Sequence, residues 1–338
     1  MRKPCRGVAS ITMRGEQAKS TDNFLYYLLH HPKYRGRRVS IYFSSPYEKL
    51  AKKIIHADKD RLPPTQWIAC NFDNTNLQDQ LDAFYSSDVC VLLYDKLQSE
   101  ESFERYTQRV RPFLDKTTDD ILKNIFLVDI ADYFDDIFRI SPKRIQSLHQ
   151  YLIETSNQSR VMRVQSELGS RITIDLTTCD PWTNLDGINY GEGMPSEIAT
   201  HTEDINGTFV FTGLLLSPIP FGAKYGVIHE PVTFEIERGM IVGCKTAHSE
   251  LLKDLEYYFQ HAKTHRKIEE IGIGTNEGLP TLKGTTGVFE ERHMGLHFGL
   301  GGKEDNSIHL DLVSADSQIY FDDKVIFNEK FLFSGDFK

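Results

Sequence analysis

Residues 306–320, with the sequence NSIHLDLVSADSQIY, decide the fold of the C-terminal half of the chain. In a β-strand successive side chains point to opposite faces, so His309 and Asp311 share one face. Leu310 and Leu312 take the other face, which predicts burial against an apolar core. An imidazole and a carboxylate on one face of a buried strand either bind each other or converge on a positively charged group.

The composition is that of a soluble globular protein. The 338 residues are enough for two domains of ordinary size, and the 40% of hydrophobic residues supply their cores. A net charge of −9 argues against nucleic acid as the main partner, because phosphate binding needs clustered positive charge. The apolar runs are too short and too broken to cross a bilayer, and the N-terminus has no signal-like apolar region. We therefore expect a cytoplasmic protein that binds neither nucleic acid nor membranes.

The N-terminal part of the chain alternates between two kinds of segment. Apolar strands are predicted at residues 37–44, 65–72 and 88–95, and helices at residues 47–57 and 76–87. Strands that are apolar on both faces and separated by helices indicate a parallel sheet with helices on each side. The sequence therefore predicts an α/β domain, to which we assign residues 1–166.

Further helices are predicted after the third strand. Helical stretches are expected around residues 117–138, TTDDILKNIFLVDIADYFDDIF. The next begins at Ser141, a suitable N-cap, with Pro142 at the first helical position. We expect it to run to about Glu167 and to end at Gly169.

From residue 167 onward the pattern changes to short alternating strands separated by Gly, Asn and Asp turns. Strands are predicted within residues 207–213, 231–245, 294–302, 307–313 and 317–327, and one helix at residues 249–262. ERG at residues 237–239 and DDK at residues 322–324 are typical of hairpin turns. The sequence therefore predicts a β-rich α+β domain over residues 167–338, which completes an overall α/β fold class.

This second domain carries side chains that favour metal binding in apolar surroundings. They fall in four places and are Glu192, Glu197, His201, Glu269, Glu270, His293, His297, His309 and Asp311. Imidazoles and carboxylates suit zinc, iron or manganese, and the scattered cysteines argue against a thiolate site. Each residue also has a structural interpretation: a core histidine with hydrogen bonds, a simple His–Asp pair, or a solvated glutamate turn.

Four motifs in this part resemble a known family. Residues 167–211, ELGSRITIDLTTCDPWTNLDGINYGEGMPSEIATHTEDINGTFVF, are followed by EEIGIGTNEG, LHFGLGG and IHLDLV. In order and spacing they resemble the metallo-aminopeptidases typified by aminopeptidases T and S, and the related 2,5-dihydroxypyridine 5,6-dioxygenases. The resemblance implies an aminopeptidase T-like fold. It also implies that a divalent metal ion (Zn, Mn or Fe) is held by Glu197, Glu270, His297, His309 and Asp311.

The motifs depart from the family pattern at three points. Glu304 stands where the peptidases carry a catalytic tyrosine, and PSE replaces PxGE at Glu197. In the dioxygenases a histidine stands at the position of Glu270. The missing tyrosine predicts slow or no turnover of simple aminoacyl substrates, because an oxyanion stabiliser lowers a barrier by roughly 2–4 kcal/mol.

The resemblance favours a metal-dependent enzyme acting on a peptide or an amino-acid-derived small molecule, in a specialised biosynthetic or catabolic step. One or two ions would be bound, and Glu197 or Glu270 would serve as the proton shuttle. Two alternatives stay open: a mononuclear iron dioxygenase using His297, His309 and Asp311, and a non-catalytic peptide-binding scaffold. A homodimer is expected from the family alone.

Overall fold

The computed structural model describes residues 9–32, 34–35, 39–57, 68–71, 89–94, 124–128, 130, 132–188, 194–219, 221–303 and 307–333. Contacts divide the chain into two compact units. The first is Met1–Pro142 with Gly187–Met194, and the second is Lys143–Asp186 with Pro195–Lys338. The proposed domain boundary at residue 167 therefore lies inside the second unit, and it stays a prediction. None of the described helices combines the length and the apolar composition needed to cross a bilayer.

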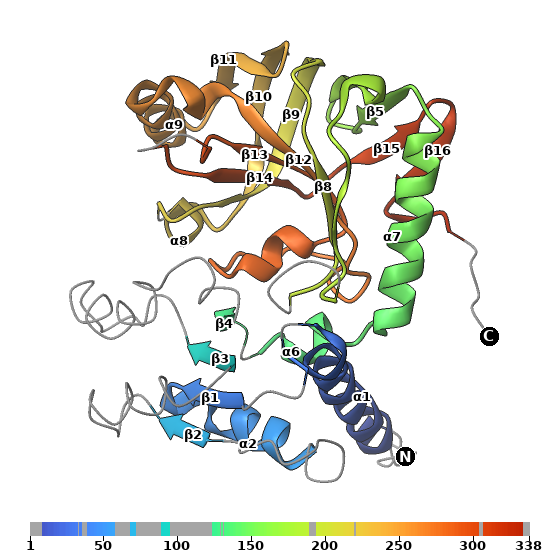
Figure 1. Ribbon diagram of the computed structural model, residues 1–338. Coiled ribbons are helices and arrows are strands. Elements are labelled where there is room, and N and C mark those ends of the chain that lie inside the picture. The colour runs from blue at the N-terminus through green and yellow to red at the C-terminus, as the bar shows by residue number, and fades with distance from the viewer. Residues whose placement is uncertain are drawn as a thin grey trace, which may run out of the picture. The chain divides into compact units, whose positions relative to one another are not determined.

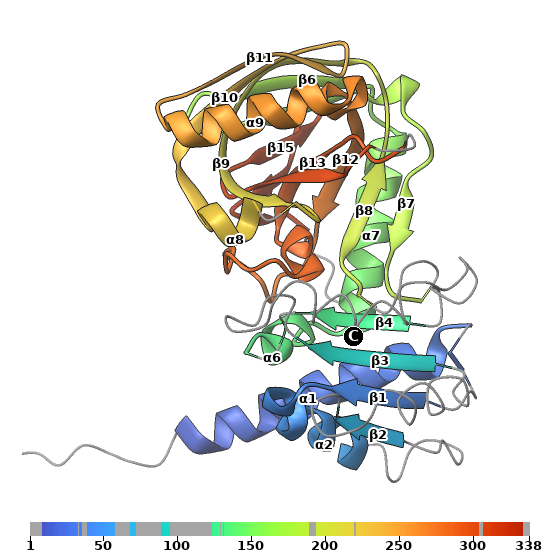
Figure 2. The same cartoon turned by 90° about the vertical axis from the view of Figure 1, so that its left-hand side faces the viewer.

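The first unit contains the predicted parallel sheet. Its strand order is β2-β1-β3-β4, with the bounds Ile68–Asn71, Val39–Phe43, Val89–Tyr94 and Asn124–Val128 (Figure 2). Every neighbouring pair is parallel, as predicted from strands that are apolar on both faces. The described helices of this unit are α1 (Ala9–His30), η1 (Ser45–Tyr47), α2 (Glu48–Ala57) and α6 (Phe134–Ile137).

The expected helix over residues 117–138 is wrong at its centre. Asn124–Val128 is the strand β4, which pairs with β3, and among the described residues of this segment a helix forms at Phe134–Ile137 alone. A short apolar run such as NIFLV fits a buried strand or a buried helix equally well, so its periodicity did not distinguish them. The helix expected at residues 76–87 lies outside the described residues.

The second unit is built on a large antiparallel sheet that curls on itself (Figure 1). Its described strands follow the order β17-β16-β15-β5-β6-β9-β14-β13-β12-β8-β7, and β10 joins β9 to β11. The bounds are β5 Val161–Gln165, β6 Arg171–Asp175, β7 Thr183–Leu185, β8 Glu197–Thr200, β9 Ile205–Leu216, β10 Val227–Glu237, β11 Met240–Thr246, β12 Ile268–Gly274, β13 Gly295–Leu300, β14 Leu310–Ser314, β15 Gln318–Phe321, β16 Lys324–Asn328 and β17 Lys330–Phe331.

Helices and short 3-10 turns complete this unit. They are α7 (Pro142–Asn157), η2 (Leu176–Thr178), α8 (Phe221–Tyr225), α9 (Ser249–His261), η3 (Lys263–Arg266) and η4 (Val288–Arg292). Helix α7 is shorter than expected, because residues 161–165 form strand β5 instead of its continuation. Met162 and Val164 are buried on one face of that strand, which pairs with β6 and β15.

Both predicted hairpin turns are confirmed. Arg238 and Gly239 join β10 to β11 with φ angles of 51° and 72°, as a type I′ turn requires. Asp322 and Asp323 join β15 to β16. The core lies on one face of the sheet, where Leu296, Phe298 and Leu300 of β13 pack with Leu255 and Tyr258 of α9.

The core histidine His149 ties α7 to the end of β12. Its Nδ1 lies 2.6 Å from Oδ1 of Asn184, to which it donates, and its Nε2 lies 2.7 Å from Oγ1 of Thr275, from which it accepts. Both ring nitrogens are therefore satisfied by a neutral imidazole. Burial lowers the pKa of His149 from 6.5 to about 4, although the hydrogen bond with Asn184 opposes the shift.

This shift predicts a loss of stability in mild acid. Between pH 6.5 and about 4 the unfolded chain binds a proton at His149 that the folded chain does not, so the free energy of unfolding falls as the pH falls. The effect should approach about 3 kcal/mol. Denaturant unfolding of the wild type and of His149→Gln at pH 4.5 and 7 measures it. The difference between the free energies of unfolding at pH 7 and pH 4.5 should be about 2–3 kcal/mol smaller in the variant than in the wild type. Equal differences in the two proteins would contradict this role of His149.

Candidate metal centre

Three of the predicted ligands meet on the face of the sheet opposite to the core. Glu197 opens β8, Glu270 lies on β12 and His297 lies on β13. One ligand atom from each lies within 4.8 Å of the other two. Nε2 of His297 faces both carboxylates, at 3.2 Å from Oε1 of Glu197 and 3.4 Å from Oε1 of Glu270.

Strand register explains why these distant segments meet. Strand β12 lies between β8 and β13, with Gly274 opposite Glu197 and Gly272 opposite His297. Because side chains alternate along a strand, Glu270 shares the face of Gly272 and Gly274. The side chains of Glu197, Glu270 and His297 therefore project from neighbouring strands to the same side.

Glycines provide the space on this face. A Cβ atom at Gly272 would lie 1.9 Å from Nε2 of His297, so the imidazole occupies the volume of the missing side chain. A Cβ at Gly299 would lie 2.6 Å from Cε1 of His309 and 2.9 Å from Cβ of Glu270. The glycines of GIGTN and HFGLG thus leave the space that the polar side chains occupy.

A β-bulge separates the two neighbouring glutamates. The pairing of β12 with β13 shifts between Ile268 and Glu270, so that Ile268 joins the core while Glu270 stays on the ligand face. Glu269 instead forms ion pairs with Lys267 and Lys303, at 3.2 and 3.0 Å.

His201, another predicted candidate, belongs to this separate group. Its Nε2 lies 3.7 Å from Oε2 of Glu269. Burial opposes ionisation of Glu269, but the two lysines outweigh it and hold the pKa of this carboxyl below its usual value. Glu269 therefore has its own positive partners and lies apart from the three convergent ligand atoms.

His309 and Asp311 form a hydrogen-bonded pair beside the three convergent ligands. Nε2 of His309 lies 2.7 Å from Oδ1 of Asp311, and Asp311 stands opposite Gly299 in the pairing of β14 with β13. Burial opposes protonation of His309, but Asp311 and Glu270 raise its pKa to about 9. The first interpretation of the opening motif is confirmed, because the two side chains bind each other. Their convergence on a positively charged group stays a prediction.

Two residues of the site were missed in the sequence. Glu291 and Arg292 come from η4, and the guanidinium of Arg292 pairs with Glu197 and with Glu291, the latter at 2.9 Å. Burial and the charge of Asp311 raise the pKa of Glu291 well above its usual value. The signal for these residues was the charged run EER directly before a glycine-rich apolar strand. Such a run is usually solvated, so only tertiary structure revealed its burial.

The other candidates lie elsewhere. His293 donates from Nδ1 to the carbonyl of Leu279 at 2.8 Å, and burial lowers its pKa, as expected for a structural histidine. It lines a polar cavity of about 260 Å³ together with Asp316 and Glu329. Glu192 and Glu304 lie outside the described residues.

The described side chains fit a divalent cation. Glu197, Asp311 and His297 are 3%, 4% and 1% exposed, which places several carboxylates in low-dielectric surroundings. Burial disfavours a charged His297, yet the carboxylates of Glu270, Asp311 and Glu291 outweigh it and raise its pKa. A site that favours positive charge and has imidazole and carboxylate donors has the chemistry of a zinc, manganese or iron site.

Comparisons with known proteins support the fold. No protein-family profile and no curated protein sequence matches the chain. The chain is similar to AmpT from Thermus thermophilus, with a TM-score of 0.62 and 10% identity over 95% of this chain and 100% of that one. It is also similar to 2,5-dihydroxypyridine dioxygenase from Pseudomonas putida KT2440, with a TM-score of 0.58 and 17% identity over 94% and 96% of the two chains. The predicted aminopeptidase T-like fold is therefore confirmed.

The space left by Gly272 gives a test of the metal site. Gly272→Ala should displace the His297 imidazole, because the new methyl group and Nε2 would be only 1.9 Å apart. We expect the affinity for Zn²⁺ or Mn²⁺, measured by calorimetric titration, to fall by roughly 10- to 100-fold.

Gly243→Ala is the matched control on another strand. There the added methyl would meet only the flexible side chain of Glu235, at 3.4 Å, so metal affinity should not change. Equal affinity for the ion in Gly272→Ala and the wild type, with both folded by circular dichroism, would contradict the geometry.

Proposed function

We propose that this protein is a metal-dependent enzyme and that Glu197, Glu270 and His297 hold its metal ion. The observation that carries the proposal is the convergence of these three ligand atoms within 4.8 Å on the non-core face of the sheet. The shared fold and the four ordered motifs of the metallo-aminopeptidases support the same assignment. We assign His309 and Asp311 to the edge of the site, where Asp311 is almost fully buried.

The two predicted catalytic glutamates differ in accessibility. The side chain of Glu270 is 33% exposed, whereas that of Glu197 is 4% exposed. Glu270 is therefore the ligand that a substrate reaches, and we assign it the proton transfer in addition to its contact with the ion, while Glu197 is the buried ligand. A divalent ion bound here would supply Lewis acidity toward a carbonyl group and lower the pKa of a bound water.

The charge of the site favours an amine-bearing substrate. Glu197, Glu270 and Asp311 place three carboxylates on the ligand face, and Arg292 and His309 balance only part of their negative charge. Burial and the charge of Asp311 raise the pKa of Glu291, so this residue keeps its proton to higher pH than an exposed glutamate. An ammonium group is attracted to such surroundings, which fits a peptide N-terminus or an amino-acid-derived small molecule.

Arg292 favours a single ion over two. Its guanidinium lies between the carboxylates of Glu197 and Glu291, where it supplies a fixed positive charge. A second divalent ion near the same carboxylates would meet this guanidinium and be repelled. We therefore infer that the protein binds one ion and that Arg292 holds the second oxygen of Glu197.

A second candidate function is that of a mononuclear iron dioxygenase. It is favoured by the one-ion site and by the similarity to 2,5-dihydroxypyridine dioxygenase. Protein purified without oxygen distinguishes the two candidates. One iron per chain with substrate-dependent oxygen uptake would assign the dioxygenase, and zinc or manganese with amide hydrolysis would assign the peptidase-like enzyme. No bound metal and no stabilisation by added ions would leave a binding scaffold.

Metal content of three variants tests the ligand set. Glu270→Gln removes a charged ligand and should lower the ion content, measured by elemental analysis after dialysis, at least about tenfold. His309→Ala should also lower it, because His309 orients Asp311 through their 2.7 Å hydrogen bond.

Glu269→Gln is the matched control, since it changes the adjacent glutamate that faces Lys267 and Lys303. This variant should keep the wild-type ion content. Undiminished metal in Glu270→Gln and His309→Ala, with circular dichroism unchanged, would refute the ligand set.

Ion stoichiometry tests the role of Arg292. The wild type should bind one Mn²⁺ per chain in a calorimetric titration, and Arg292→Met should bind a second, because Glu197 and Glu291 lose their fixed counter-charge. Arg266→Met is the control, since Arg266 donates to the carbonyl of Ile241 in another part of the unit and should leave the stoichiometry at one. Two ions in the wild type would overturn the inference while leaving the metal site intact.

A further inference from the structure

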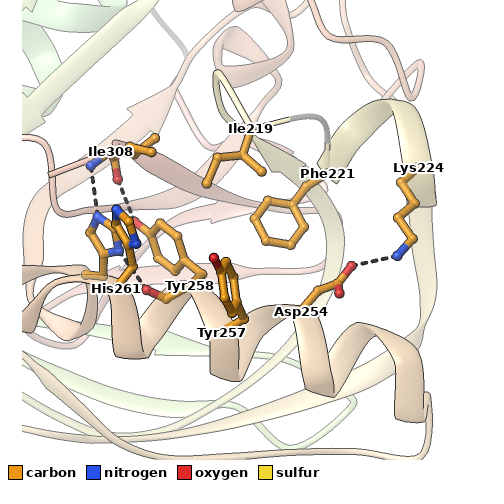
Figure 3. Close-up of a pocket in the computed structure, with 9 residues that line it drawn as sticks. Ile219, Phe221, Lys224, Asp254, Tyr257, Tyr258, His261 and Ile308 are labelled. Carbon is orange, nitrogen blue, oxygen red and sulfur yellow. Dashed lines mark hydrogen bonds and ion pairs between the residues drawn. The ribbon is translucent and has the colours of Figure 1, made fainter. Parts of the chain in front are cut away.

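A second cavity lies in the unit that carries the metal site. It has a volume of about 320 Å³ and is formed by α8, α9, η3 and the segment before β14 (Figure 3). Its wall includes Ile219, Phe221, Tyr257, Tyr258, His265 and Ile308. Tyr258 belongs to the same apolar cluster as Leu300 and Leu310, so the cavity lies on the core side of the sheet. None of the five predicted metal ligands lines it.

Aromatic rings shape the interior of this cavity. Tyr258 and His265 are stacked, with ring centroids 4.0 Å apart and an angle of 5° between the planes. Phe221 meets Tyr258 edge-on at 6.3 Å, and His261 lies nearly parallel to His265 at 5.8 Å. Faces and edges of rings at these distances are the surroundings in which another aromatic ring binds well.

The buried polar atoms of the wall are already satisfied. Nδ1 of His265 donates to the carbonyl of Tyr258 at 2.7 Å, and Nε2 accepts from the amide of Ile308 at 2.9 Å. The hydroxyl of Tyr258 donates to the carbonyl of Ile308 at 2.7 Å. A charged or strongly polar ligand would therefore lose its hydrogen bonds to water without replacement in the interior.

The charges at the rim also cancel. Nζ of Lys224 lies 2.7 Å from Oδ2 of Asp254, and Figure 3 shows this ion pair at the side of the cavity near Phe221. Lys224 also pairs with Glu250 at 2.8 Å, so the described residues of the rim offer no free positive charge to attract an anion. Tyr257 is 73% exposed, which leaves a large aromatic side chain at the cavity to cover a bound ring.

We propose that this cavity binds an uncharged aromatic small molecule of one or two rings. The volume lies at the lower end of the range of small-molecule sites, which matches a compound of that size. Its ring would pack between Phe221, Tyr258 and Ile308, and its polar edge would face solvent near Tyr257. The proposal is independent of the metal site.

Calorimetric titration of the full chain with indole tests the proposal, and indole-3-acetate serves as the anionic control. We expect one indole per chain with a dissociation constant of about 0.1–1 mM, and at least tenfold weaker binding of indole-3-acetate. The result should be the same with and without EDTA. Ile219→Trp fills the cavity and should abolish indole binding, and Tyr257→Ala, at an exposed position, should weaken it several-fold.

Val242→Ala is the control variant, since Val242 is 53% exposed on β11 and does not line the cavity. It should bind indole like the wild type. Absence of saturable binding by the wild type, equal binding of the anion, or unchanged binding by Tyr257→Ala and folded Ile219→Trp would each overturn the proposal.

Discussion

The non-core face of β12 and β13 depends on the absence of side chains at two positions. Gly272 and Gly299 leave space for the His297 and His309 rings, which would otherwise clash with a methyl group at 1.9 and 2.6 Å. The same strands present Ile271, Ile273, Phe298 and Leu300 to the core. One sheet therefore combines an ordinary apolar core on one side with a dense group of ionisable side chains on the other. The glycines make the second arrangement sterically possible.

The ionisable side chains of this face are buried, and their charges are only partly neutralised by one another. Carboxylates from four segments lie close together, and against the effect of burial they raise the pKa values of His297 and His309. Burial and the charge of Asp311 raise the pKa of Glu291. Arg292 and the His309–Asp311 pair relieve part of the repulsion. A divalent cation would relieve the rest, and this is the physical reason for preferring a metal site to a set of structural ion pairs.

The fold by itself does not choose the reaction. This chain shares its architecture with AmpT from Thermus thermophilus and with 2,5-dihydroxypyridine dioxygenase from Pseudomonas putida, at identities of 10% and 17%. Proteins with different names thus share one fold, so the function has to be argued from the site. Here the features that point to a particular chemistry are the two unequal glutamates, Glu197 and Glu270, and the fixed charge of Arg292. An aromatic-lined cavity on the core side of the sheet gives the same unit a second place for a small molecule.

Local patterns in the sequence were enough to predict many of the strands of this protein and the faces on which their side chains lie. Apolar runs separated by helices predicted the parallel sheet, and strand alternation placed His309 and Asp311 on a face opposite to Leu310 and Leu312. Short segments with two acceptable conformations were decided by their neighbours: residues 124–128 became a strand because β3 offered a parallel partner, and residues 161–165 because β6 and β15 did. Only the tertiary structure separated Glu270 from Glu269, because a β-bulge is a property of strand pairing. It alone also brought Glu291 and Arg292 into the site, since burial of a charged run depends on what packs over it and is not encoded in the run itself.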